Sequence, residues 1–276
     1  MKKLLFVTGS RGEWGYIRPI LKLIKERSDV RYSICATNMH LLPQHGMSVK
    51  EIEADGFEIE DYIYMSLDGY DHFTMTKSLG VFYQSFVDTV RRVCPDWIVI
   101  AGDRGEQLVA AMVGAYTYTP VAHIQAGEKS GNIDGISRHA IARFSHLHFA
   151  ANEDAAQRLI KSGEESFRVH NVGAPMLDEL FQGMEADIEE LSGKYNIDRS
   201  KPYILVTQHP VTEEFNSATE QISATMEALE VFDMPKVIIL PNNDAGSSAI
   251  RQGIFQKKRG AIYTFSNLSR KDYLDL

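Results

Sequence analysis

The sequence predicts an α/β protein made of two doubly wound domains. Short apolar segments, typical of buried parallel strands, alternate with longer segments of helical periodicity. A polar or glycine-rich turn follows most of the apolar segments. The alternation restarts after residue 174. We therefore expect a first domain at residues 1–174 and a second domain at 175–276.

The first domain begins with a short apolar run that ends in Gly9-Ser10-Arg11-Gly12. The next segment has Ile17, Ile20, Leu21 and Ile24 at helical spacing, so a helix is expected to pack back onto the sheet. The strands predicted for this domain are 4–8, 31–36, 57–64, 97–101, 119–124 and 147–150. The further helices predicted are 45–55, 76–93, 107–116, 137–145 and 154–161, with 125–135 as a polar loop.

The second domain repeats the alternation over a shorter length. Its predicted helices are 178–195, 217–232, one after residue 248, and the start of one at 269–276. Its predicted strands are 203–207, 236–240 and 261–265. Because three strands leave an edge that sheets usually cover, we expect this domain to be incomplete in the chain.

Composition excludes several classes of protein. Hydrophobic residues make up 44% and charged residues 24%, which is typical of a folded globular chain. The net charge of −8 argues against general binding to nucleic acid or to an anionic membrane surface. Two cysteines make no disulfide framework, and no cleavable signal or spanning apolar run is evident. These features predict a cytoplasmic protein.

Ligands of parallel α/β sheets bind at the carboxyl ends of the strands. There the sequence places Arg11, suited to phosphate, and the acid–base candidates Asp103, Glu128 and Asp134. His209 follows a strand of the second domain and is a candidate donor to a phosphate or leaving oxygen. The remaining polar residues at these ends include Glu13, Arg104, Glu106, His123, Gln125, Asn243 and Asp244.

Each of these residues also has a structural alternative. Asp103 is suited to capping the helix that follows it, and Arg11 to a salt bridge with Glu13. His146 and His148 share a strand face, but no third ligand at a recognisable spacing favours a metal site. The spacing Gly9-x-x-Gly12-x-x-Gly15 is not the dinucleotide fingerprint, and no phosphate-binding Gly-Lys-Ser/Thr loop occurs.

The chain resembles the hydrolysing UDP-N-acetylglucosamine 2-epimerases. The resemblance is carried by segments in the family's order: GSRGEWG (9–15), GDRGEQ (102–107), HIQAGEKSGNIDGISRHAI (123–141), SHLHFAANE (145–153), NVGAP (171–175), TQHP (207–210) and PNNDAGS (241–247). It implies two Rossmann-like domains, as in the GT-B glycosyltransferases, with the site in the cleft between them.

The resemblance also implies the chemistry. The family eliminates UDP across C1–C2 of the sugar and hydrates the glycal, giving UDP and a free sugar epimerised at C2, without a metal or organic cofactor. The partner is then a UDP-sugar, and a homo-oligomer, dimer or tetramer, is expected. Carried over by motif, Asp103, Glu128 and Asp134 move protons, while Arg11 and His209 face the diphosphate. Further binding residues are Arg104, Gln125, Arg138, His139, Asn243 and Asp244, of which Arg138 and His139 shape the sugar pocket or support the carboxylates.

Three departures from the family leave alternatives open. Many members have two acids where this chain has Asp134-Gly135, and the non-hydrolysing relatives have an acid in place of Gln125. Gly135 and the Glu-Trp-Gly after Arg11 favour the branch acting on diacetamido-trideoxy (bacillosamine-type) sugars, which feeds sialic- or legionaminic-type synthesis. The family continues beyond the equivalent of Leu276 with a segment that holds the uridine. The alternatives are therefore a nucleotide-sugar-binding protein without turnover and a GT-B glycosyltransferase.

Overall fold

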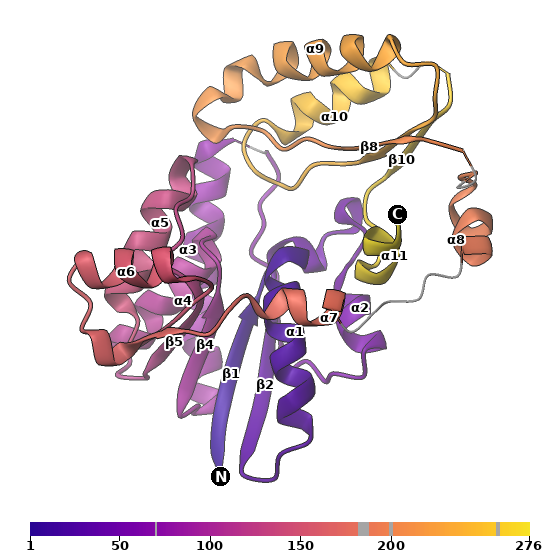
Figure 1. Cartoon of the computed structure of the whole chain (residues 1–276). Coiled ribbons are helices and arrows are strands. Elements are labelled where there is room, and N and C mark those ends of the chain that lie inside the picture. The colour runs from indigo at the N-terminus through magenta and orange to yellow at the C-terminus, as the bar shows by residue number, and fades with distance from the viewer. Residues whose placement is uncertain (70, 182–187, 199–200, 258–259) are drawn as a thin grey trace. The chain divides into compact units, whose positions relative to one another are not determined.

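The computed structural model describes residues 1–69, 71–181, 188–198, 201–257 and 260–276. It divides into two compact units, each with its own parallel sheet (Figure 1). Unit 1 comprises Met1–Leu42, Met47–Leu67 and Thr76–Gln182, and unit 2 comprises Pro43–Gly46, Asp68–Met75 and Gly183–Leu276. The predicted α/β class with two doubly wound sheets is confirmed, while the boundary at 174/175 stays a prediction.

Unit 1 contains a seven-stranded sheet in the order β3-β2-β1-β4-β5-β6-β7, and all of its pairings are parallel. Its strands are β1 (Lys2–Thr8), β2 (Val30–Thr37), β3 (Asp61–Ile63), β4 (Trp97–Ala101), β5 (Val121–Ala126), β6 (Leu147–Ala150) and β7 (Val169–Asn171). Its α-helices are α1 (Arg11–Lys25), α2 (Val49–Ala54), α3 (His72–Val93), α4 (Gly105–Tyr116), α5 (Asn132–Phe144), α6 (Glu153–Lys161) and α7 (Asp178–Phe181), of which α3 begins within unit 2. Short 3-10 turns are η1 (Asn38–Leu41), η3 (Ser166–Arg168) and η4 (Pro175–Leu177).

The two faces of this sheet build two hydrophobic cores, because successive strand residues point to opposite sides. Leu5 and Val7 of β1 pack with the buried residues of α3, α4 and α5. Phe6 packs on the other side with α1 and α2. The strand ends are thereby held in register, so the polar segments that follow β1, β4 and β5 lie at one edge of the sheet.

Helix α1 shows how the sequence fixes one of these elements. Ile17, Leu21 and Ile24 are buried at the predicted helical spacing, and Trp14 extends the buried face. Ser10 caps the helix, and the Glu13 side chain reaches back to complete a capping box. The helix therefore begins at Arg11, directly after the turn that leaves β1.

A cavity of about 550 Å³ lies against the α1 side of the sheet. Apolar side chains of the central strands line it, including Phe6, Val99, Ile124 and Phe149. Residues 172–175 complete the lining together with Asp178, and no acid–base candidate takes part. This cavity is therefore not the candidate site, which lies at the ends of the strands.

Unit 2 contains a three-stranded parallel sheet in the order β10-β9-β8. Its elements are η2 (Pro43–His45), α8 (Ile188–Tyr195), β8 (Ile204–Thr207), η5 (Thr212–Ser217), α9 (Ala218–Glu230), β9 (Lys236–Ile239), α10 (Ser247–Gln256), β10 (Ile262–Phe265) and α11 (Arg270–Asp275). Ile222, Ile238, Ile250 and Ile254 form one side of its core, and Val237, Ile239 and Leu268 form the other.

The structure corrects several predicted boundaries. Helix α5 begins at Asn132, five residues before the predicted start, so the polar loop is shorter than expected. Strand β5 continues past Ile124 through a β-bulge, and β7 has no counterpart among the predicted strands. The predicted helix 45–55 is the short α2 preceded by η2, and the extended segment 57–64 pairs only over β3. The predicted helix 178–195 corresponds to α7 and α8, with residues 182–187 outside the described residues.

Candidate active site

The Arg138 guanidinium organises a cluster of polar groups at the ends of β4 and β5. Its Nη2 lies 2.5 Å from Asp103 Oδ2, and its Nε donates to Ser130 Oγ at 3.1 Å. Its Nη1 donates to the Gln125 carbonyl and lies 3.7 Å from Glu128 Oε2. Because the Arg138 side chain is only 8% exposed, its charge is shielded from solvent and acts strongly on these neighbours. One guanidinium therefore holds two carboxylates of the candidate site.

Asp103 keeps one oxygen available within this cluster. Its Oδ2 accepts hydrogen bonds from both Ser130 Oγ, at 2.6 Å, and Arg138. Among the described residues, its Oδ1 accepts no hydrogen bond, and its side chain is 19% exposed. Asp103 does not cap helix α4, whose N-cap is Arg104. The capping alternative for Asp103 is therefore wrong, and the carboxylate presents one oxygen to the edge of the sheet.

The turn after β5 takes its shape from the bulge at Gln125. The Gln125 backbone is left-handed, with φ +58°, and the register of β5 against β6 shifts between Ile124 and Ala126. The Gln125 amide Nε2 then donates to Glu128 Oε1 at 3.1 Å. An acid at this position would repel Glu128 instead of donating to it. Gln125 is thus a physical partner of Glu128 in this chain.

Buried His123 fixes the turn that carries Asp103. Its Nε2 lies 2.7 Å from the Gly102 carbonyl, and the imidazole is fully buried in β5. Burial lowers the pKa of His123 to about 3, and the nearby Arg138 lowers it as well, although the Gly102 bond opposes them. The neutral ring therefore donates from Nε2 to Gly102, which has the left-handed φ of +82° that glycine permits.

Tyr16 of helix α1 lies beside the same turn. A Cβ atom on Gly102 would lie 3.5 Å from Tyr16 Cε2, so the ring packs against the residue before Asp103. The charges of Arg138, Asp103 and Glu128 all act on its hydroxyl. Burial is the main cause that raises the pKa of Tyr16, and the carboxylates raise it further, so the phenol is neutral near pH 7.

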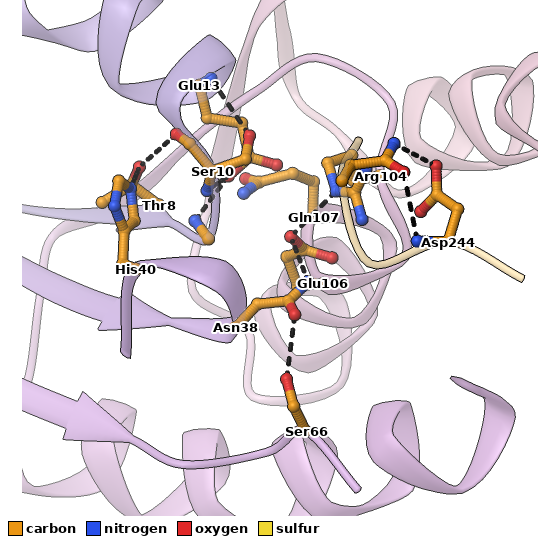
Figure 2. Close-up of polar contacts among 12 residues, drawn as sticks. Thr8, Ser10, Glu13, Asn38, His40, Ser66, Arg104, Glu106, Gln107 and Asp244 are labelled. Atoms are coloured by element: carbon orange, nitrogen blue, oxygen red, sulfur yellow. Dashed lines mark hydrogen bonds and ion pairs between the residues drawn. The ribbon is translucent and has the colours of Figure 1, made fainter. Parts of the chain in front are cut away.

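A pair of buried carboxylates, Glu13 and Glu106, supports the turn after β1 (Figure 2). Glu13 accepts hydrogen bonds from the Gly9 and Ser10 amides, and Glu106 Oε1 accepts one from Asn38 Nδ2 at 2.9 Å. A Cβ on Gly9 would lie 2.3 Å from Glu106 Oε1, so only glycine fits there. Burial, followed by the charge of Glu106, raises the pKa of Glu13 well above its usual range.

This chain is similar to known proteins in both sequence and fold. A family model described as UDP-N-acetylglucosamine 2-epimerase matches residues 22–276. The UDP-N,N'-diacetylbacillosamine 2-epimerase (hydrolyzing) of Legionella pneumophila is 34% identical over 276 residues, which are 100% of this chain and 73% of that relative. The chain belongs to the UDP-N-acetylglucosamine 2-epimerase family.

Other relatives agree with this assignment. The UDP-N-acetylglucosamine 2-epimerase of Neisseria meningitidis serogroup B is 30% identical over 276 residues, covering 100% of this chain and 72% of its own length. The crystal structure of the Methanocaldococcus jannaschii UDP-GlcNAc 2-epimerase in complex with UDP-GlcNAc and UDP matches with a TM-score of 0.82 at 18% identity, over 99% of this chain and 75% of that one. That likeness shows that the fold is the GT-B-like fold of the family, as the resemblance implied.

The other predicted residues of unit 1 lie around this cluster in different ways. Arg11 is half-buried at the start of α1, and its charge contributes to a lowered pKa of His40, for which burial is the main cause. Arg104 Nε lies 3.3 Å from Glu106 Oε1. Asp134 sits in the first turn of α5, so its predicted place in a loop is wrong.

His139 lies apart from the Arg138 cluster. It is solvent-exposed, and it makes no hydrogen bond or ion pair with the described part of the chain. Neighbouring residues of a helix point about 100° apart, so burial of Arg138 turns His139 outward. The structure therefore shows no contact through which His139 would support the carboxylates, and its contact with substrate stays a prediction.

The predicted residues of unit 2 gather at the ends of β8 and β9. The Asn242 amide N–H donates to His209 Nδ1 at 3.3 Å. The neutral imidazole therefore carries its proton on Nε2, where it acts as a donor. Asp244 accepts from the Asn242 side chain, and its backbone N–H donates back to Asn242 Oδ1 at 3.2 Å. Asn243 lies between them, so His209, Asn243 and Asp244 belong to one local group.

Sequence reasoning missed Tyr16 as a member of the site, and it placed Glu13, Glu106 and His123 at strand ends without assigning them a role. One signal was present for Glu13, since Ser10 followed by Glu13 is a capping-box pattern. Tyr16 and His123 look like ordinary core residues of a helix and a strand, and only the tertiary contacts with Gly102 distinguish them.

The described residues contain neither a metal-binding cluster nor a membrane-spanning helix. No group of three or more His, Cys, Asp or Glu side chains in these residues could hold a metal ion. None of the helices in the same residues is both long and apolar enough to cross a membrane.

Proposed function

We propose that this chain is a hydrolysing 2-epimerase of a UDP-activated, N-acetylated hexosamine, either UDP-N-acetylglucosamine or UDP-N,N'-diacetylbacillosamine. Membership of the family supports the reaction, and the names of the Legionella and Neisseria relatives support these two substrates. The observation that carries the proposal is the placement of Asp103 and Glu128 on one buried guanidinium, beside a turn of unit 1 that follows the carboxyl end of a strand.

The proposed reaction has two steps, an elimination of UDP and a hydration of the resulting glycal. In the first, a base takes the proton from C2, the C1–O bond breaks with its electron pair going to the β-phosphate oxygen of UDP, and a C1=C2 double bond forms. In the second, an acid returns a proton to the opposite face of C2, a water supplies hydroxide to C1, and the other proton of that water restores the acid. The C2 proton taken by the base in the first step passes to UDP or to solvent. The sum is UDP-sugar and water giving UDP and the 2-epimer as a free sugar.

The cluster provides groups suited to both steps. One oxygen of Asp103 accepts no hydrogen bond from the described residues, so it is placed to accept or return a proton. Glu128 is 29% exposed and is oriented by Gln125, so we assign it the second proton transfer. Arg138 neutralises part of their mutual repulsion and fixes both carboxylates before substrate arrives. Asp134 remains a third acid–base candidate.

The binding residues complete the proposal. Arg11 and Arg104 are assigned to the phosphates, because a guanidinium forks onto phosphate oxygens. His209 is assigned to the diphosphate or the leaving oxygen, and Asn243 and Asp244 to the substrate as well. His139 is assigned to the sugar. We further propose that the product is of the N-acetylmannosamine type, used for sialic- or legionaminic-type sugars, and that the protein is a dimer or tetramer.

The test is incubation of the chain with each UDP-sugar in deuterium oxide. We expect UDP release in step with a free sugar, whose NMR spectrum shows the inverted configuration and deuterium at C2. Asp103→Asn keeps the shape of the side chain but removes its basicity, so it should abolish exchange at C2. Binding of either UDP-sugar without UDP release, or sugar transfer that requires an added acceptor, would refute the proposal.

A further inference from the structure

The Tyr16 side chain lies beside the turn that carries Asp103. Tyr16 is half-buried, and its hydroxyl makes no hydrogen bond with the described residues. The ring itself is held firmly, since it packs against the cluster of Trp14 and Ile17 and against Gly102. The chain thus anchors the aromatic ring and leaves its polar atom available to a ligand.

The Tyr16 hydroxyl is near residues assigned to two parts of the substrate, the diphosphate and the sugar. Tyr16 follows Arg11 by five residues on α1, which is roughly 7.5 Å along the helix axis. Arg11 is the residue assigned to phosphate, and the Tyr16 hydroxyl is close enough to Arg138, Asp103 and Glu128 for their charges to act on it. The bond that joins the diphosphate to the sugar is the C1–O bond, which the proposed reaction breaks.

We propose that the Tyr16 hydroxyl contacts the substrate at this bond and donates a hydrogen bond to the β-phosphate oxygen that leaves C1. The inference rests on the proposed function. The phenol keeps its proton throughout: the C2 proton goes to a carboxylate, the C1–O electron pair goes to the phosphate oxygen, and Tyr16 stabilises the charge that develops there. A neutral phenol suits this role, because it is a donor and a poor base.

Nothing else in the described structure requires this hydroxyl. The ring supplies the packing on Gly102 and on the α1 core, and a phenylalanine would supply the same packing. What separates Tyr16 from Tyr32, whose hydroxyl also has no partner among the described residues, is its place beside the turn of Gly102 and Asp103.

The test compares Tyr16→Phe with Tyr32→Phe. Tyr32 is the matched control, because it is half-buried on β2 against Phe57, with ring centroids 5.8 Å apart, and its hydroxyl has no hydrogen-bond partner among the described residues either. We expect Tyr16→Phe to lower kcat for UDP release roughly 10- to 100-fold, with KM changed less than about threefold. The urea midpoint should equal that of the wild type, and Tyr32→Phe should change none of these quantities.

The outcomes are distinguishable. Wild-type turnover with an unchanged kcat in Tyr16→Phe overturns the role of Tyr16 and leaves the proposed function standing. A fall in kcat together with a lower urea midpoint, or with an equal effect in Tyr32→Phe, assigns Tyr16 to packing and also overturns the inference. A wild-type chain that releases no UDP from either sugar overturns the proposed function and the role of Tyr16 with it.

Discussion

Replacing His123 by glutamine should change how the stability of unit 1 depends on pH. His123 is fully buried, donates to Gly102 at 2.7 Å, and has its pKa lowered from 6.5 to about 3. Glutamine carries a donor at nearly the position of Nε2 but does not titrate. His123→Gln therefore removes the proton linkage while keeping a donor for the turn before Asp103.

The sign follows from proton binding. Between about pH 3 and pH 6.5 the unfolded chain binds a proton at His123 and the folded chain does not, so protonation favours unfolding. The stability from the neutral ring is present above pH 6.5 and is lost as the pH falls towards 3. At roughly 1.4 kcal/mol per unit, lowering the pH from 7 to 5 costs the wild type about 2 kcal/mol through this residue.

The assay is urea unfolding followed by tryptophan fluorescence at pH 7, 6 and 5. Trp14 and Trp97 are the two tryptophans of the chain and both lie in unit 1, so the signal reports the unit that contains His123. Between pH 7 and 5, His123→Gln should lose about 2 kcal/mol less unfolding free energy than the wild type. His139→Gln, at an exposed position, should lose as much as the wild type. Equal pH dependence in His123→Gln and the wild type would refute the reasoning.

Three further predictions concern the Arg138 cluster and the turns around it. Arg138→Lys keeps the positive charge but cannot bridge two carboxylates, so kcat for UDP release should fall about tenfold or more. An unchanged kcat would contradict the role given to the guanidinium. Gly135→Ala places a Cβ 2.7 Å from the Ser130 carbonyl oxygen, so the urea midpoint should drop by the equivalent of about 1–3 kcal/mol. Gly131→Ala, whose added Cβ meets no atom within 4 Å, should leave the midpoint nearly unchanged. Equal midpoints for the two variants would show that the loop at Ser130 moves without cost. Burial and a neighbouring carboxylate raise the pKa of Glu13, so the stability of the wild type should decline as the pH rises above about 4.5. In urea titrations from pH 5 to 8, Glu13→Gln should lack that decline, and parallel stability curves for the two proteins would contradict a raised pKa.

The sequence predicted the strands and helices that carry most of unit 1 because their apolar periodicity is strong. The helix with Ile17, Leu21 and Ile24 is one case, and its core face is confirmed. The start of α5 was missed because Ile133 and Ile136 are exposed, so the first turn has no apolar face to mark it. β7 was missed because its three residues are half-buried or exposed, and its pairing with β6 is a tertiary choice.

The candidate site shows the same difference between features set by local sequence and features set by tertiary packing. Asp103 and Glu128 could be selected from sequence because each follows a strand end, and Arg138 through the resemblance to the family. The separation of 35 positions between Asp103 and Arg138 gives no sign of their ion pair. That pair depends on the register of β4 against β5 and on the packing of α4 against α5. Tyr16 shows the limit most clearly, because its ring obeys the apolar pattern of α1 and only its hydroxyl departs from it. The ring of a tyrosine fits the apolar periodicity of a helix regardless of what its hydroxyl binds. An argument from periodicity therefore assigns such a residue to the core. Only the fold shows that this polar end lies beside the turn of Gly102 and Asp103 and accepts no bond from the described residues.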